Sequence, residues 1–190
     1  MKLARDGIPT VTFLVLATVA FAFVSPVPAA VMAVLAALVV WFYRDPDRTA
    51  PEGDGLFVSP ADGRVVEIFM NVLSVHVNRA PCMGRVDYLE YVPGRKIAAF
   101  APKAAEVNER NLVGLSTPYG PVLMVQIAGL LARRIVCRLR RGEVLEAGQR
   151  YGMIRLGSRV DIYLPKDVRL LTKHGDKVYA GISSLGVMDS

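Results

Sequence analysis

The chain has 190 residues, of which 53% are hydrophobic and 21% charged, and its formal net charge is +6. This length allows one modest folded domain plus an apolar segment, and excludes a large multidomain protein. Neither a basic run interleaved with aromatic residues nor a glycine-rich phosphate loop is present, so we expect anionic lipid rather than nucleic acid as the partner. Cys82 and Cys137 lack metal-ligand spacing, which predicts reduced, non-catalytic thiols and no metal site.

The first predicted element is the segment of residues 7–43, which has no charged side chain and exceeds the length of a membrane span. Pro26 and Pro28 divide it into two legs, Val11–Ser25 and Ala29–Tyr43. At ~1.5 Å per residue each leg reaches ~22 Å, short of a hydrocarbon core of ~30 Å. A helical membrane hairpin fits these lengths best, while a single tilted span and a cleaved signal peptide stay open as alternatives.

Basic residues flank both ends of this apolar segment. Since basic flanks favour the cytoplasmic side, we expect both ends, and the domain that follows, at the cytoplasmic face of the cell (inner) membrane. An aromatic cluster at the end of the segment is typical of the headgroup region. The flanking cations are Lys2 and Arg5 before the segment and Arg44 and Arg48 after it.

A stretch rich in proline, glycine and aspartate follows the apolar segment and cannot continue a helix. The sequence therefore predicts three parts. They are a membrane anchor at residues 1–44, a linker at residues 45–55 and a folded domain at residues 56–190.

The folded domain is predicted to be mainly β, because short period-two runs alternate with Gly, Pro and Asp. Helical turns are expected only at Asn108–Asn111 and around Gly129–Arg133. Residues 141–154 and 174–187 resemble each other, and each stretch predicts a hairpin. The expected strands are Arg64–Phe69, Ser74–Val77, Val86–Val92, Val122–Ile127, Ile135–Arg138, Met153–Leu156 and Val160–Leu164.

The two similar stretches look like turns of lipoyl- and biotinyl-type domains, so we expect a flattened β-sandwich resembling those hybrid folds. A carrier of that kind needs an acceptor lysine at a hairpin tip. The corresponding turn here, Arg155-Leu-Gly-Ser-Arg-Val, holds Ser158 instead. A carrier-like module without catalysis and a membrane-tethered scaffold stay open as alternative functions.

Several short motifs occur together in a fixed order, and the ordered set is far more specific than any one of them. The chain thereby resembles the phosphatidylserine decarboxylase family, in its short bacterial and archaeal, archaetidylserine decarboxylase-like form. The motifs are Phe42-Tyr-Arg-Asp-Pro, Ser59-Pro-Ala-Asp-Gly, Ser74-Val-His-Val-Asn-Arg-Ala-Pro, Glu109-Arg-Asn, Gln126-Ile-Ala-Gly-Leu-Leu-Ala-Arg-Arg-Ile-Val and Arg155-Leu-Gly-Ser-Arg-Val-Asp.

This resemblance implies an enzyme of phospholipid biosynthesis that decarboxylates phosphatidylserine to phosphatidylethanolamine. The proenzyme (zymogen) would cleave itself between Gly157 and Ser158, leaving two chains as a heterodimer and turning Ser158 into a covalent pyruvoyl group. The substrate amine would form a Schiff base with that ketone, so the resemblance implies neither a metal nor pyridoxal phosphate.

The resemblance also implies roles for two further residues. Asp62 corresponds to the family's self-cleavage machinery, and His76 is the candidate for handling protons. Longer family members carry a second histidine where this chain has Arg79, which cannot act as a base at neutral pH. Arg79 is instead a candidate for binding the substrate's carboxylate or phosphate. The motifs do not distinguish ester-linked from ether-linked lipids, and they leave homo-oligomerisation and the extent of processing open.

Overall fold

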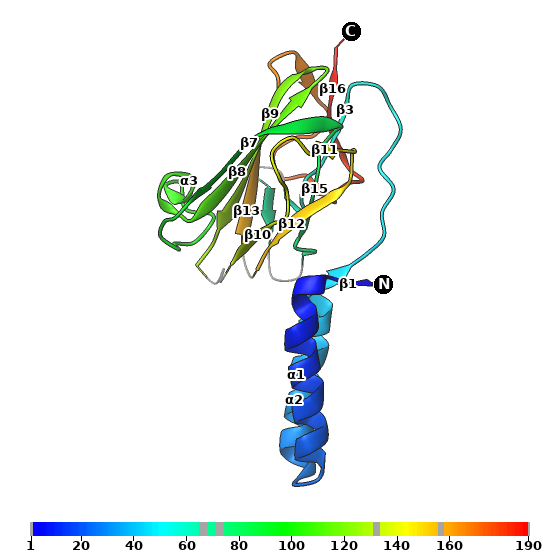
Figure 1. Cartoon of the computed structure of the whole chain (residues 1–190), viewed down its shortest axis with the longest axis vertical. Coiled ribbons are helices and arrows are strands. Elements are labelled where there is room, and N and C mark those ends of the chain that lie inside the picture. The colour runs from blue at the N-terminus through cyan, green and yellow to red at the C-terminus, as the bar shows by residue number, and fades with distance from the viewer. Residues whose placement is uncertain (1, 65–67, 71–73, 131–133, 156–157, 190) are drawn as a thin grey trace. The chain divides into compact units, whose positions relative to one another are not determined.

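The computed structural model describes residues 2–64, 68–70, 74–130, 134–155 and 158–189. The chain forms two compact units, Met1–Asp47 and Arg48–Ser190. Helices dominate the first unit and strands the second (Figure 1). The predicted fold class, mainly β after an N-terminal apolar helical segment, is confirmed, whereas the likeness to lipoyl-type domains stays a prediction.

In the first unit, α1 (Ile8–Ala22) and α2 (Pro26–Phe42) lie side by side as a helical hairpin (Figure 1). Their outer ends are tied together, because β1 (Lys2–Leu3) pairs antiparallel with β2 (Arg44–Asp45). This two-stranded ribbon of β1 and β2 therefore holds the N-terminus and the C-terminal end of α2 at the same end of the hairpin.

The hairpin is apolar on all sides, as expected of helices that face lipid. Phe13 is 68% and Phe23 88% exposed. Within the described residues one helical stretch, Arg5–Ala22, is long and apolar enough to cross a membrane, and α2 is slightly shorter. Pro26 and Pro28 lie in the first turn of α2, where a missing N–H costs little, so the prolines begin the second leg.

The second unit is built on a long curled sheet with the strand order β11-β7-β8-β9-β13-β5-β4-β15 (Figure 1). Two smaller sheets, β10-β12-β6 and β14-β16-β3, complete it among the described residues. The bounds are β3 Leu56–Val58, β4 Gly63–Arg64, β5 Ile68–Met70, β6 Val77–Arg79, β7 Gly84–Val92, α3 Ala104–Val107, β8 Arg110–Thr117, β9 Gly120–Ala128, β10 Ile135–Cys137, β11 Val144–Leu145, β12 Arg150–Ile154, β13 Ser158–Tyr163, β14 Val168–Leu170, β15 Lys177–Val178 and β16 Ser184–Met188.

The core of this unit lies where the inner face of the long sheet packs against the smaller sheets. One cluster joins Val113 and Met124 of the long sheet to Phe57 and Tyr151. A second cluster surrounds β13, where Val160 packs with residues of β5, β10 and β12. Burial of these side chains supplies the main driving force for folding.

Several sequence predictions about local structure are wrong. The predicted strand 64–69 is two strands, since Arg64 of β4 pairs antiparallel with Phe69 of β5. The helical turn expected at 108–111 is replaced by the start of β8, and the helix α3 precedes it. The predicted helical turn at 129–133 falls largely outside the described residues.

The two similar stretches are not hairpins, because the strands in each pair with different partners. In the first stretch β11 pairs with β7, while β12 pairs with β10 and β6. In the second, β15 pairs with β4 and β16 with β3 and β14. The internal likeness is nevertheless real, since Gly142, Gly148, Gly175 and Gly181 all adopt positive φ.

Candidate active site

Ser158 is the first residue of β13, at the middle of the long sheet. It pairs with Ala128 of β9 on one side and Met70 of β5 on the other. Its side chain is fully buried, and its Oγ has no hydrogen-bond partner among the described residues. Such a group costs roughly 1–3 kcal/mol and calls for a functional reason. Gly157, the other half of the predicted cleavage bond, lies outside the described residues.

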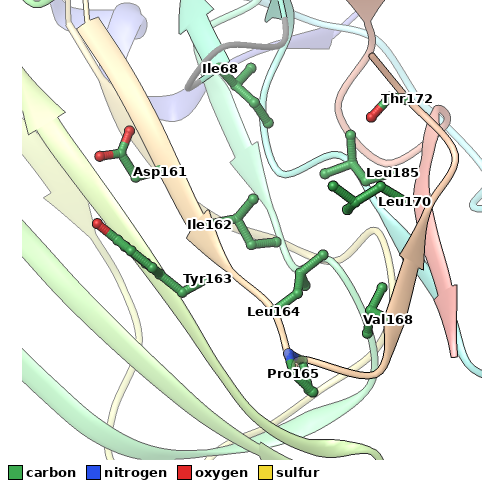
Figure 2. A pocket seen from close by; sticks show the side chains of 10 residues that line it. All are labelled: Ile68, Asp161, Ile162, Tyr163, Leu164, Pro165, Val168, Leu170, Thr172 and Leu185. Carbon is green, nitrogen blue, oxygen red and sulfur yellow. The ribbon is translucent and has the colours of Figure 1, made fainter. Parts of the chain in front are cut away.

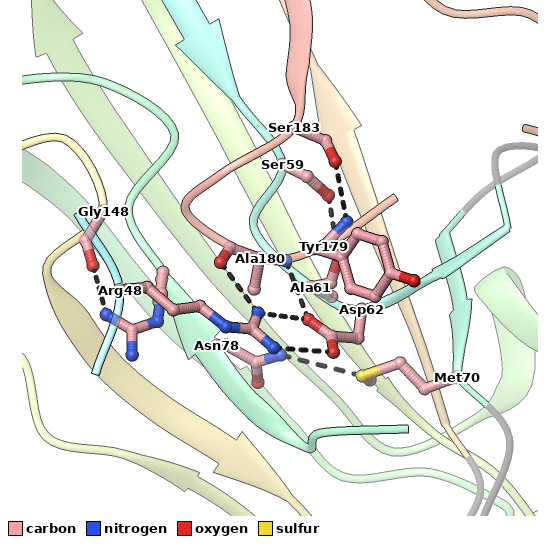
Figure 3. Close-up of polar contacts among 11 residues, drawn as sticks. Arg48, Ser59, Ala61, Asp62, Met70, Asn78, Gly148, Tyr179, Ala180 and Ser183 are labelled. Carbon is pink, nitrogen blue, oxygen red and sulfur yellow. Dashed lines mark hydrogen bonds and ion pairs between the residues drawn. The ribbon is translucent and has the colours of Figure 1, made fainter. Parts of the chain in front are cut away.

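Three hydrogen bonds hold Asp62, and each of its carboxylate oxygens accepts from at least one donor (Figure 3). Arg48 grips it as a bidentate partner, with Nη2 2.9 Å from Oδ2 and Nη1 2.5 Å from Oδ1. The backbone N–H of Ala180 donates to Oδ1 at 2.8 Å. Both charged side chains are buried, so the pair is a fixed internal ion pair.

Arg48 is a residue that sequence reasoning placed in the linker. The structure instead makes it the counter-ion of Asp62, and Nη1 also donates to the Ala180 carbonyl at 2.9 Å. No motif spacing connects positions 48, 62 and 180. The one feature of the sequence that could have indicated a role for Arg48 is that it is the single arginine in a stretch rich in turn-forming residues.

His76 lies just before β6 and is fully buried. Its carbonyl accepts the N–H of Ile154 at 3.4 Å, which continues the pairing of β6 with β12. Because side chains alternate along an extended strand, His76 and Asn78 point to the same side of β6. Asn78 contacts Met70 and Gln126 of the long sheet, so that side faces the sheet that carries Ser158.

Arg79 points to the other side of β6 by the same alternation. It is 4% exposed, and its Nη1 donates to the Gly148 carbonyl at 2.9 Å. The contact places Arg79 beside the turn between β11 and β12, inside the first of the two similar stretches. The role of Arg79 in substrate binding stays a prediction. In the structure its guanidinium binds the backbone of a turn.

A chain of buried amides crosses from the long sheet to β6. Asn111 Nδ2 donates to Gln126 Oε1 at 3.0 Å, and Gln126 Nε2 donates to Asn78 Oδ1 at 2.8 Å. Asn78 Nδ2 then lies 4.0 Å from Met70 Sδ (Figure 3). None of these three polar residues was singled out by the sequence, although each lies within or beside a recognised motif.

Cys82 and Cys137 are free thiols, as predicted. Burial raises the pKa of the Cys82 thiol to about 12, which keeps it protonated and unreactive at neutral pH. Burial also raises the pKa of Cys137. A nucleophilic role for either thiol is therefore disfavoured.

A pocket of about 520 Å³ opens further along β13 (Figure 2). Apolar side chains dominate its wall, including Ile162, Leu164 and Leu185. Fully buried Val160 lies between Ser158 and Ile162 on the same face of β13, so this pocket is separated from the serine. The pocket is thus distinct from the candidate active site.

Comparison with known proteins identifies the family. The phosphatidylserine decarboxylase family model matches residues 35–68 and 64–185. The phosphatidylserine decarboxylase proenzyme of Symbiobacterium thermophilum is 46% identical over 97% of this chain and 94% of its own length. The proenzymes of Syntrophus aciditrophicus (44% identity, 97% and 96% coverage) and Xanthobacter autotrophicus (48%, 76% and 72%) are similar as well. The chain therefore belongs to the phosphatidylserine decarboxylase family, as its ordered motifs predicted.

Proposed function

We propose that this chain is a self-cleaving proenzyme that decarboxylates phosphatidylserine to phosphatidylethanolamine at the membrane. The observation that carries the proposal is the fully buried Ser158 hydroxyl, which lacks a hydrogen-bond partner among the described residues and heads a central strand. Family membership supports the substrate, since the similar proteins are named as phosphatidylserine decarboxylase proenzymes.

In the proposed maturation, Ser158 Oγ attacks the carbonyl carbon of Gly157, and the C–N bond breaks as the amide nitrogen takes the hydroxyl proton. The resulting ester then loses the Ser158 α-proton and releases the Gly157 carboxylate. Tautomerisation and hydrolysis by water release ammonia and leave a pyruvoyl group at the head of β13. No external oxidant or metal is needed, because the elimination and hydrolysis balance internally.

The residues around Ser158 fit such a group. A pyruvoyl group supplies a ketone that condenses with an amine and accepts electrons as carbon dioxide leaves. β13 would hold it rigidly, because Ser158 is paired with neighbours on both sides. His76 is our candidate for moving the proton, and Asp62 would fix the loop that follows β3 through Arg48 and Ala180.

The two proposed chains would remain together after cleavage. The fragment from Ser158 onward supplies β13, β14, β15 and β16, which pair with β9, β5, β3 and β4 of the other fragment or with each other. The apolar hairpin would tether the unit to the cytoplasmic face of the membrane, where its lipid substrate resides.

The test is the intact mass of the purified protein under denaturing conditions, beside that of a Ser158→Ala variant. Two chains in the wild type, the smaller reactive toward hydroxylamine, and one chain in the variant would support the proposal. A second assay would follow loss of phosphatidylserine and gain of phosphatidylethanolamine in mixed micelles. A wild-type chain that stays intact on prolonged incubation would refute self-processing.

A further inference from the structure

The buried amide chain has a fixed direction. Gln126 Nε2 lies 3.5 Å from the Val136 carbonyl, which can only accept a hydrogen bond. Gln126 therefore presents its N–H groups toward Val136 and Asn78, and its oxygen toward Asn111. Because Asn78 Oδ1 is used as the acceptor, the Asn78 group that faces Met70 must be the Nδ2 donor. An amide flip at Asn78 would place its N–H groups against those of Gln126 Nε2 and is excluded on this ground.

The outer Asn78 N–H is poorly satisfied for a buried polar group. Among the described residues, the acceptor that it faces is the thioether of Met70 at 4.0 Å, and a thioether is a weak acceptor. Asn78 is itself fully buried. The Asn78 Nδ2–H group is therefore fixed in place and can donate to a stronger acceptor.

Strand register places this donor next to Ser158. Met70 and Ser158 are directly paired across β5 and β13, while Gln126 pairs with Val160, two residues along β13. Directly paired residues have Cβ atoms roughly 5 Å apart, and diagonal neighbours roughly 7–8 Å. Asn78 contacts both Met70 and Gln126, so its amide lies over the part of the sheet that includes Ser158.

We propose that Asn78 Nδ2–H is the oxyanion donor for self-cleavage, aligned by Gln126 and Asn111. The inference rests on the proposed function and adds a residue that stabilises its first step. When Ser158 Oγ adds to the adjoining carbonyl, the electron pair of the C=O bond moves to its oxygen. That negative oxygen is bonded to the carbon that Oγ attacks, so it forms beside the Ser158 side chain. It is a far stronger acceptor than Met70 Sδ, and a preorganised donor lowers the barrier to its formation.

The first test replaces Asn78 by aspartate, which has the same shape but loses the donor when ionised. We expect Asn78→Asp to cleave roughly 100-fold more slowly than the wild type at pH 8. Protonation of the new carboxyl would restore an O–H donor, so the ratio of variant to wild-type cleavage rates should rise as pH falls. Asn78→Leu should be slow at every pH. A purely structural role for Asn78 would not produce this pH-dependent recovery.

The second test leaves Asn78 in place and reverses the amide chain. In Gln126→Glu, both carboxylate oxygens accept, so Asn78 would turn its Nδ2 toward residue 126 and its oxygen toward Ser158. We expect cleavage as slow as in Asn78→Leu. The matched control is Met70→Leu, which removes the sulfur but no donor and should cleave at close to the wild-type rate.

Each variant is also made in the full-length Ser158→Ala background, where urea unfolding compares stabilities without cleavage. Slow cleavage with near-wild-type unfolding supports the inference. Wild-type cleavage rates in either Asn78→Leu or Gln126→Glu would overturn it, and so would cleavage by Met70→Leu that is as slow as theirs. If the wild type itself never cleaves, the proposed function fails instead, so the two failures are distinguishable.

Discussion

The ion pairs of the second unit differ in how far they are exposed to solvent. Arg48 and Asp62 are both less than one-tenth exposed, whereas the Arg85–Asp87 pair on β7 is 61% and 41% exposed. An ion pair in the interior has no water to replace a lost partner. Loss of the arginine should therefore lower the free energy of unfolding more in the buried Arg–Asp pair than in the exposed one.

Replacing Arg48 by methionine should destabilise the unit by about 3–5 kcal/mol, because Asp62 would be left buried without its counter-charge. The matched control is Arg85→Met, which should cost at most about 1 kcal/mol because its pair is solvated. Urea unfolding of both in the Ser158→Ala background measures the difference. Equal effects of the two substitutions would contradict the internal role of Arg48.

Cys82 provides a pH-dependent test at the same scale. Its pKa is raised from 9.0 to about 12 in the folded chain by burial. Between these values the unfolded chain loses the thiol proton while the folded chain keeps it, so the free energy of unfolding should fall as pH rises through this window. The contribution is fully present below pH 9.

The measurement is urea unfolding of the wild type and Cys82→Ala at pH 8 and pH 10. The decline between the two pH values should be smaller in the variant. Iodoacetamide at pH 8 should leave Cys82 unmodified in the folded protein and modify it in urea. Alkylation of folded protein at the rate of a free thiol would show that the site is open.

Motif order found Ser158, Asp62 and His76 because each stands inside a contiguous block of sequence. Arg48 was missed because it lies outside every recognised motif, and nothing in the motif that contains Asp62 indicates its partner. The sequence did not predict the buried amides, because an Asn or Gln that will be buried cannot be distinguished from an exposed one until its partners are known. These residues are Asn78, Gln126 and Asn111. Residue roles at the site remain predictions, although the structure does bring Asp62 and Arg48 together.

Among the elements, β8 shows why local patterns fail. Its inward positions hold Asn111, Val113 and Leu115, so a polar residue interrupts the apolar alternation. Gly114, at an outward position, contributes no side chain to the pattern, and a Cβ there would lie 2.9 Å from Tyr88 Cβ on the neighbouring strand. Both departures are explained by partners on other strands, namely Gln126 and Tyr88. The predicted strands Val86–Val92 and Val122–Ile127 lie inside β7 and β9 and end within two residues of the ends of those strands.

Two glycines in the second of the two similar stretches, Gly175 and Gly181, give a prediction for its turns. Gly175 has φ +92° with open space where a Cβ would stand, whereas Gly181 has φ +70° and a Cβ there would lie 2.7 Å from Arg79 Cδ. Gly175→Ala should cost about 1–2 kcal/mol for the left-handed backbone alone. Gly181→Ala should cost about 1–3 kcal/mol more, because Arg79 is held at Gly148 and cannot swing aside freely.

Urea midpoints of both variants in the Ser158→Ala background test this ordering. A third variant, Gly181→Ala with Arg79→Ala, removes the clash and should recover part of the difference. Equal costs for the two single variants would mean that Arg79 does not restrict this turn.

For the whole molecule, the ribbon of β1 and β2 bears on membrane topology. It joins the two ends of the helical hairpin, supported by a hydrogen bond from the Ala4 N–H to the Tyr43 carbonyl at 2.8 Å. A single span would separate these ends by the thickness of the bilayer. We therefore expect the N-terminus and the second unit on one side of the membrane.

Single cysteines at Lys2 and Asp189, in a Cys82→Ala and Cys137→Ala background, test this topology with a membrane-impermeant maleimide. Both should react in inside-out vesicles, and neither in intact spheroplasts. Labelling of the two positions from opposite sides would establish a single span instead. The anchor was predictable from composition, whereas the closing ribbon depends on pairing between residues far apart in sequence.

The central position of β13 has a consequence for the lifetime of the mature molecule. After cleavage, the shorter fragment would be a separate polypeptide whose strands lie in two of the three sheets described for the second unit, the long sheet and β14-β16-β3. Its refolding would become bimolecular and dependent on concentration, whereas the uncut chain refolds as one body. Maturation would thus remove the covalent link that keeps the two fragments together during refolding. The unfolding and refolding curves of the mature enzyme should therefore differ, whereas those of Ser158→Ala should coincide.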